Sequence, residues 1–215
     1  MLYRFGASLL GYDALNAQLV TLPKSVVEAI PSWHKLTEDP RKYGFHATLK
    51  APFRLSSGAV EADLVAAFEE FTGGCRTIPV IRPVARLLRH FIAIVNDAPN
   101  ADLTRLADDC VTVFESFRAP LTLQDRERRL KSPLSSNQIA MLDRWGYPYV
   151  FEEFFFHMSL TGRIEHAARA QTLEVIAAQF ARLDQQSLAI DRLALFRQDH
   201  PSAKFTAIRH IALRG

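Results

Sequence analysis

Two stretches of the 215-residue sequence share one pattern, in which a histidine and a hydroxyl residue alternate with apolar residues. The first, Tyr43–Phe53, reads Y-G-F-H-A-T-L-K-A-P-F, and the second, Phe154–Gly162, reads F-F-F-H-M-S-L-T-G. Alternation of this kind is typical of a strand that buries one face, because successive side chains of a strand point to opposite sides. The sequence therefore predicts two strands that each present an imidazole and a hydroxyl, and we expect the two presented faces to line one cleft.

The residues presented by these two predicted strands form the candidate site. The catalytic candidates are His46, Thr48, His157 and Ser159, and the substrate-binding candidates are Tyr43, Lys50 and Phe155. An imidazole can serve as the base for an attacking water or as the acid for a leaving oxygen, because its ordinary pKa lies near neutrality. The hydroxyls can donate to phosphate oxygens, and the lysine can add positive charge. This set of groups suits hydrolysis of a phosphodiester, with base and acid unassigned between the two histidines and with core packing an equal alternative for Phe155.

The order of predicted elements after each histidine is the same, namely one helix and then two strands. After the first histidine we expect a helix that begins at Val60 and stops at Gly73, followed by strands at 77–87 and 90–95. After the second histidine we expect a helix at 165–183, followed by strands at 187–196 and 204–213. Short turns between strands favour antiparallel sheets with helices packed on one side. The sequence therefore predicts an α+β fold of two similar lobes, related by a pseudo-twofold duplication, with helices outside and the active cleft between the lobes.

We expect these lobes to form one bilobal domain over residues 1–215. Its approximate halves are 1–120 and 134–215, joined by a charged linker at 118–133 that contains the run R-E-R-R-L-K. A charged run of this kind is typical of a solvated surface.

Capping residues and prolines predict the shorter elements. A helix is expected at 22–30, with a proline near its start and another at its end, and a polar loop at 37–41 leads into the first histidine strand. Ser135 and Gln138 have capping-box spacing, so they predict a short helix that Gly146 terminates.

Composition sets the broad class of protein. Hydrophobic residues make up 48% and charged residues 23%, as in ordinary globular proteins, and a net charge of +3 is too small to predict a nucleic-acid or membrane partner. The two cysteines, Cys75 and Cys110, form no C-x-x-C motif, which fits a reducing compartment. With no apolar run long enough to span a bilayer and no secretory signal at the start, we expect a cytoplasmic protein.

Other uses of the histidines have weaker support. The sequence has no H-x-H and no H-E-x-x-H, and neither motif has an acidic residue at ligand spacing, so we expect no metal and no other cofactor. It also has no G-x-S-x-G, no P-loop and no G-x-G-x-x-G motif. A third His-x-Ser, at His200, contains a proline among turn residues and cannot be a central strand.

The two motifs, H-A-T-L at His46 and H-M-S-L at His157, resemble those of the two-histidine phosphoesterase superfamily, which includes RNA 2′,5′-ligase-like proteins and cyclic nucleotide phosphodiesterases. The longer strings R-F-G-A-S-L-L-G-Y-D, Y-G-F-H-A-T-L-K-A-P-F and R-W-G-Y-P-Y-V-F-E-E-F-F-F-H-M-S-L-T-G are similar to a branch of phosphonate metabolism proteins that are often encoded with carbon–phosphorus lyase genes. Members of that branch carry a further strand ahead of the region that matches Leu2, so either the present sequence begins late or this member lacks that edge strand.

The resemblance implies a bilobal, metal-independent phosphodiesterase in which the motif histidines fall on His46 and His157 and the motif hydroxyls on Thr48 and Ser159. Its expected substrate is a small cyclic phosphate, such as a ribose cyclic phosphate that arises in phosphonate breakdown. One alternative is an RNA-end enzyme acting on 2′,3′-cyclic termini or 2′,5′ linkages, with its basic groove supplied by Arg126, Arg128, Arg129 and Lys131. Another is a binding module for phosphate ligands without catalysis. The sequence leaves the oligomeric state open.

Overall fold

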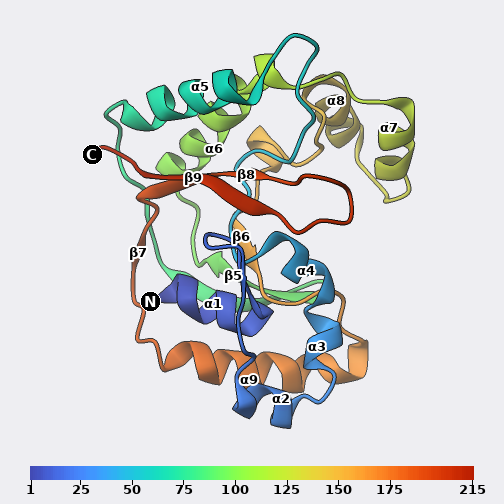
Figure 1. The fold of residues 1–215 in the computed structure, drawn as a ribbon. Coiled ribbons are helices and arrows are strands. Elements are labelled where there is room, and N and C mark those ends of the chain that lie inside the picture. The colour runs from blue at the N-terminus through green and yellow to red at the C-terminus, as the bar shows by residue number, and fades with distance from the viewer. The chain divides into compact units, whose positions relative to one another are not determined.

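The structure, a computed structural model, describes all residues from Met1 to Gly215 and combines helices with short antiparallel strands (Figure 1). This confirms the predicted α+β class. Contacts divide the chain into two compact units built from interleaved segments. Unit 1 consists of Met1–Ala47, Val80–Pro99 and His157–Ala212, and unit 2 consists of Thr48–Pro79, Asn100–Phe156 and Leu213–Gly215. The consecutive halves 1–120 and 134–215, the duplicated lobes and the cleft between them stay predictions.

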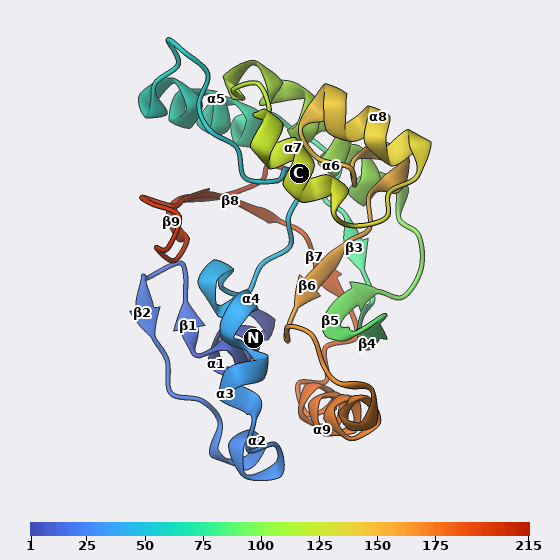
Figure 2. The same ribbon diagram turned by 90° about the vertical axis from the view of Figure 1, so that its right-hand side faces the viewer.

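A three-stranded antiparallel sheet forms the core of unit 1 (Figure 2). It consists of β4 (Pro83–Leu88), β5 (Phe91–Asn96) and β6 (His157–Ser159), in that order. The central strand carries the run I-A-I-V, whose four side chains are fully buried, as expected for a strand covered on both faces. Helix α9 (Arg169–Ala181), preceded by a 3₁₀ turn at His166–Ala168, packs beside β4 (Figure 2).

Nine residues near the start of the chain form a helix, α1 (Leu2–Leu10), which the mixed apolar pattern does not predict. It ends at Gly11, whose φ of 71° is the left-handed conformation common at helix ends. Gly6 weakens the local helix signal, because glycine has low helix propensity. A residue far along the chain explains why glycine is needed here. A Cβ added at Gly6 would lie 2.1 Å from the ring of Phe45.

Three short helices follow, and one of them corrects a prediction. Helix α2 (Lys24–Ala29) confirms the expected helix, lies beside α9, and is followed by α3 (Trp33–Leu36) (Figure 1). The predicted polar loop at 37–41 is wrong, because α4 (Glu38–Tyr43) occupies it. Its two acids lie in the first turn and its two bases in the last, which suits the helix dipole, and a proline is tolerated in the first turn.

The predicted strand over Tyr43–Phe53 is also wrong. Tyr43 ends α4, and the only β-type pairing in this stretch is an isolated antiparallel bridge between Ala47 and Met158. Gly44 breaks the extended conformation with a φ of 73°, and Pro52 cannot donate a ladder hydrogen bond. The second histidine strand is confirmed as β6, although it is only three residues long.

The rest of unit 1 consists of three strand pairs. The main hairpin joins β8 (Arg192–Arg197) to β9 (Thr206–Ala212), with a register shift between Leu195 and Phe196. This confirms the two predicted strands at the end of the chain. The smaller pairs are β3 (Val80–Ile81) with β7 (Leu188–Ala189) and β1 (Tyr12–Asp13) with β2 (Gln18–Leu19).

Unit 2 is helical. Its helices are α5 (Glu61–Gly73), α6 (Ala101–Val113), α7 (Leu123–Leu130) and α8 (Ser136–Trp145), with 3₁₀ turns at Glu115–Phe117 and Phe151–Glu153. The capping box that opens α8 and the left-handed Gly146 that ends it are both present as predicted. Helix α7 lies within the segment 118–133 that we expected to be a linker. None of the helices in the structure is both long and apolar enough to cross a lipid bilayer.

Candidate active site

His157 projects from β6, the edge strand of the sheet in unit 1. The strand shows the predicted alternation, because Phe156, Met158 and Leu160 are buried while His157 and Ser159 are partly exposed. Ser159 pairs with Ala93 and His157 with Val95 on β5. Directly paired residues of neighbouring strands share a face of the sheet, so the imidazole and the hydroxyl lie on one face together.

The strand that carries His157 is anchored just beyond its end by Thr161. The hydroxyl of this buried threonine accepts a hydrogen bond of 2.9 Å from the Ile92 backbone N–H. The N–H groups of Leu160 and Thr161 both donate to the Ile92 carbonyl, at 2.9 and 3.2 Å. The ring of Phe91 lies 5.9 Å from the His157 ring in an edge-on arrangement. These contacts hold the imidazole against the rigid centre of the sheet.

His46 is placed by a tight turn rather than by a strand. Gly44, with φ 73° and ψ 177°, occupies a region of backbone conformations that is essentially restricted to glycine. A Cβ at Gly44 would lie 2.5 Å from the Cβ of the fully buried Ala14. The next residue, Phe45, is buried against Gly6 of α1. The two glycines therefore allow the backbone before His46 to pack directly onto the first segment of the chain.

The hydrogen bonding of His46 defines which ring nitrogen carries its proton. Nδ1 lies 2.9 Å from the carbonyl oxygen of Gly44. A carbonyl can only accept, so Nδ1 is the donor and Nε2 of the neutral ring lacks a proton. Burial lowers the pKa of His46 below its ordinary 6.5; the Gly44 carbonyl opposes this shift, and the charge of His157 adds to it. His46 is thus a neutral imidazole at pH 7 with a basic Nε2.

The backbone pairing brings the two histidine motifs together inside unit 1. Ala47 pairs with Met158 in an antiparallel bridge, and these residues directly follow His46 and His157. In antiparallel register, the residue before Ala47 lies opposite the residue after Met158, so His46 is opposite Ser159. The effect of the His157 charge on the pKa of His46 is consistent with this proximity. The structure therefore brings His46, His157 and Ser159 to one place.

Aromatic rings surround His46. The ring centroid of Phe196 on β8 lies 5.7 Å from that of His46, and the ring of Tyr43 lies 6.2 Å from it. Tyr43 also stacks on Phe205 at 5.0 Å, and its side chain is exposed. Of these rings only Tyr43 belongs to the predicted site. Phe196 is missed because nothing in the local run A-L-F-R distinguishes it from a core residue.

The other three predicted site residues, Thr48, Lys50 and Phe155, belong to unit 2. The Lys50 ammonium donates to Glu115 Oε2 at 2.8 Å and to the Val111 carbonyl at 2.9 Å. Glu115 in turn accepts from Arg118. Burial lowers the pKa of Lys50, and the hydrogen bond with Glu115 opposes that shift. These bonds give Lys50 a structural role in unit 2, and its contact with substrate stays a prediction.

Phe155, whose side chain is 54% exposed, is one of the more exposed apolar residues of the chain. This exposure argues against the alternative of core packing. Contact of this ring with a ligand stays a prediction. Thr48, the first residue of unit 2, directly follows the bridge residue Ala47.

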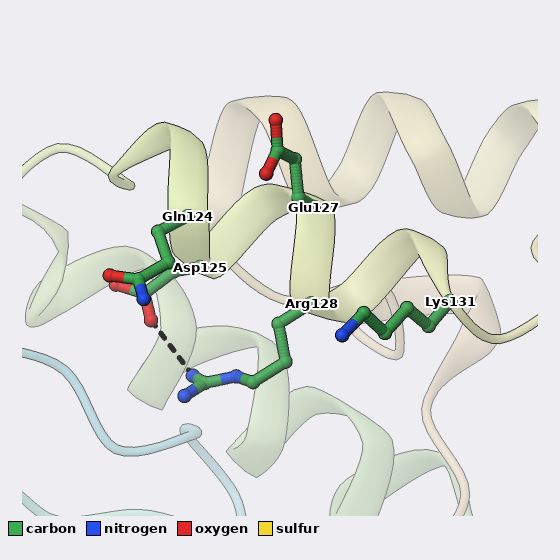
Figure 3. A pocket seen from close by; sticks show the side chains of 5 residues that line it. All are labelled: Gln124, Asp125, Glu127, Arg128 and Lys131. Atoms are coloured by element: carbon green, nitrogen blue, oxygen red, sulfur yellow. Dashed lines mark ion pairs between the residues drawn. The ribbon is translucent and has the colours of Figure 1, made fainter.

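A pocket of about 400 Å³ lies on α7 of unit 2 (Figure 3). Its lining consists of Gln124, Asp125, Glu127, Arg128 and Lys131. Figure 3 shows Arg128 turned toward Asp125, and their ion pair measures 2.9 Å. Acidic and basic groups occur together here, so the pocket favours neither an anion nor a cation. No three histidine, cysteine or acidic side chains in the structure are grouped as metal ligands would be.

Comparison with known proteins gives long matches. The chain is 39% identical over 187 residues to a protein of Janthinobacterium sp. (strain Marseille) named ribose 1,5-bisphosphate phosphokinase PhnN, a match that covers 84% of this chain and 41% of that protein. It is 29% identical over 215 residues to a protein of the same name from Laribacter hongkongensis (strain HLHK9), covering 98% of this chain and 48% of that protein. The chain thus spans less than half the length of either relative.

A family model gives the classification. Residues 48–206, well over half of the chain, match the family described as "Protein of unknown function (DUF1045)". The matched range includes the second histidine motif and β8, and it ends at the first residue of β9. The chain therefore belongs to the DUF1045 family.

Proposed function

We propose that this chain is a phosphodiesterase that opens a small cyclic phosphate by proton transfer through His46 and His157. The observation that carries the proposal is the bridge between Ala47 and Met158, which joins two segments of matching sequence pattern that lie over a hundred residues apart. Two imidazoles near one hydroxyl suffice for in-line hydrolysis, in which one removes a proton from water and the other protonates the leaving oxygen.

The hydrogen bond at His46 suggests how the roles are divided. With Nδ1 bound to the Gly44 carbonyl, the basic Nε2 of His46 accepts a proton from water as the water oxygen attacks phosphorus. His157 then donates a proton to the sugar oxygen as its bond to phosphorus breaks. The products are a phosphomonoester and a free hydroxyl, and the two histidines exchange their protons with solvent before the next turnover.

The hydroxyls and aromatic rings of the two motifs complete the proposed site. Ser159 donates to a non-bridging phosphate oxygen, because it lies on the same sheet face as His157. We assign the same role to Thr48, the hydroxyl residue of the first motif. Tyr43 provides an exposed ring of unit 1 for contact with the sugar, and Phe155 stays a candidate for the same role.

The relatives favour a ribose phosphate as the substrate. Both are named for phosphorylation of ribose 1,5-bisphosphate, and both extend far beyond the match. The present sequence has no P-loop of the form G-x-x-x-x-G-K-[ST], so we assign the kinase activity to the part of the relatives outside the match. Hydrolysis of a 1,2-cyclic phosphate of ribose 5-phosphate adds one water, breaks the bond between phosphorus and O2, and yields ribose 1,5-bisphosphate. The designation PhnN supports a place in phosphonate metabolism, as the resemblance implies.

The RNA-end alternative has less support, because two of the four cations of its expected basic groove form ion pairs within unit 2. Arg126 binds Asp143 through two hydrogen bonds of 2.6 and 3.0 Å. Arg128 pairs with Asp125, and Arg129 lies over the Tyr147 ring at 4.9 Å. Paired cations attract a phosphate backbone less strongly than unpaired ones.

The test is a turnover assay with chelator present, followed by ³¹P NMR. It compares a ribose 1,2-cyclic phosphate, a nucleoside 2′,3′-cyclic phosphate and a 2′,5′-linked dinucleotide. We expect conversion of the ribose compound to a phosphomonoester. Turnover of the nucleotides alone would support the RNA-end enzyme, and tight binding without turnover of any compound would support a binding module.

A further inference from the structure

We propose that Arg82 and Arg86, held together by Asp97, bind a second phosphate of the substrate. This inference rests on the proposed function and deepens it, because it assigns the residues that bind the 5-phosphate of the proposed substrate. None of these three residues belongs to either histidine motif.

The strand register places this group on the same sheet face as His157 and Ser159. Arg86 pairs with Ala93, which pairs with Ser159, so these three residues form one row across the sheet. The neighbouring row consists of Val84, Val95 and His157. Directly paired side chains share a face, so Arg86 projects on the catalytic face, two strands from Ser159.

Arg82 and Asp97 follow on the same face, two residues beyond Val84 and Val95 respectively. Their backbones are joined by a hydrogen bond of 3.0 Å from the Asp97 N–H to the Arg82 carbonyl. Arg86 Nη2 donates to Asp97 Oδ1, and Arg82 Nη1 lies 3.8 Å from Asp97 Oδ2. The Arg86 side chain must therefore extend from its own row past the row of His157 to reach Asp97.

The charge and exposure of the group suit an anionic ligand. Two guanidinium groups and one carboxylate carry a net charge of +1 (2 − 1). The side chains are 71% exposed for Arg82, 52% for Arg86 and 31% for Asp97, so solvent and ligands reach them. An arginine has five N–H donors in a planar fork, which binds phosphate with a fixed geometry that a lysine lacks.

The spacing also fits one pentose. Successive rows on one face are about 7 Å apart and neighbouring strands about 4.8 Å apart, so the backbone of Arg82, which directly precedes β4, lies about 12 Å from that of His157 on β6. The long arginine side chains and the imidazole cover part of this distance, so a pentose with phosphates at C1 and C5 can bridge them. The group can therefore contact the 5-phosphate while the histidines act on the cyclic phosphate. It also supplies, within unit 1, the positive charge that we expected from Lys50.

The test uses two substrates, ribose 1,2-cyclic phosphate with and without a 5-phosphate. For Arg86→Gln we expect kcat/KM to fall at least tenfold for the 5-phosphorylated substrate, mainly through KM, and to change less than twofold for the other. For Arg86→Lys we expect a kcat/KM on the 5-phosphorylated substrate between those of the wild type and Arg86→Gln. The lysine keeps the positive charge but lacks the planar set of donors of the guanidinium group. The matched control is Arg182→Gln, an exposed arginine at the end of α9, which should change neither rate.

Equal losses for both substrates, or no loss for either, would overturn the proposal. Calorimetric binding of ribose 1,5-bisphosphate and ribose 1-phosphate gives a second readout that needs no turnover. We expect the wild type to prefer the bisphosphate and Arg86→Gln to lose that preference. If neither cyclic phosphate is hydrolysed while this preference holds, the proposed function fails and the subsite stands; if the wild type shows no preference, the subsite fails.

Discussion

The segments that carry His46 and His157 have the same sequence pattern but different structures. The second forms β6, with three consecutive residues paired to β5, whereas the first pairs only at Ala47. Alternation predicts correctly that Phe156 and Met158 are buried beside a more exposed His157. An alternating pattern therefore predicts which side chains are buried. A strand forms only where several consecutive residues also pair with a neighbouring strand.

The two histidines are accordingly held by different means. His157 depends on a ladder of backbone hydrogen bonds that Thr161 extends. His46 depends on close packing at two glycines, Gly6 and Gly44, and on a hydrogen bond to a carbonyl of its own turn. A substitution that disturbs only the sheet beside His157, or only the turn before His46, can therefore show how much each contributes to the stability of the site.

The largest effect is expected from removing the imidazoles. His46→Ala and His157→Ala should each lower kcat on the ribose cyclic phosphate by roughly 10²–10⁴-fold, because each removes a general acid or base. The control is His166→Ala, an exposed histidine before α9, which should keep wild-type kcat. If only one of the two motif variants is impaired, the paired roles are wrong.

A methyl group at Gly44 should have the next largest effect. Gly44→Ala meets the Ala14 Cβ at 2.5 Å and a backbone region that is essentially restricted to glycine, so we expect a loss of about 1–3 kcal/mol of stability or more. In Gly162→Ala, beyond β6, the new Cβ lies 3.3 Å from the Leu36 carbonyl oxygen, so a smaller loss is expected. Urea denaturation of both variants measures the difference, and equal losses would show that the turn before His46 is not specially constrained.

Thr161→Val tests the anchor on the His157 side. It removes the acceptor of the buried Ile92 N–H with little change of shape, so we expect a loss of about 1–3 kcal/mol. Hydrogen exchange at Ile92 should become faster, while exchange in the helices of unit 2 stays unchanged. An unchanged rate at Ile92 would mean that the hydroxyl contributes nothing to this end of the sheet.

The smallest effect concerns pH. Burial lowers the pKa of His46, so its ring should titrate below 6.5 in an NMR titration, with the resonance assigned from His46→Gln. Because the unfolded chain binds this proton more readily than the folded one, folding becomes less favourable as the pH falls below about 6.5. A pKa at or above 6.5 would contradict the assignment of His46 as a half-buried, neutral base.

Features with local signals were predictable from the sequence, and features set by distant neighbours were not. The capping box and terminal glycine of α8 were predicted correctly, as was β5 from its run of buried residues. Helix α1 was missed because Gly6 is explained only by Phe45, nearly forty residues later. The histidines stood out through their repeated pattern, but Phe196 and Arg86 join the candidate site only through contacts and strand register.

We propose that His46 and His157 act as one pair, and the double variant is the sharpest test of that pairing. Residues that act as a unit in catalysis have strongly non-additive effects. We therefore predict that His46→Ala/His157→Ala hydrolyses the ribose cyclic phosphate about as slowly as the slower single variant. A double variant whose loss equals the product of the two single losses would contradict the account, because the two histidines would then act independently.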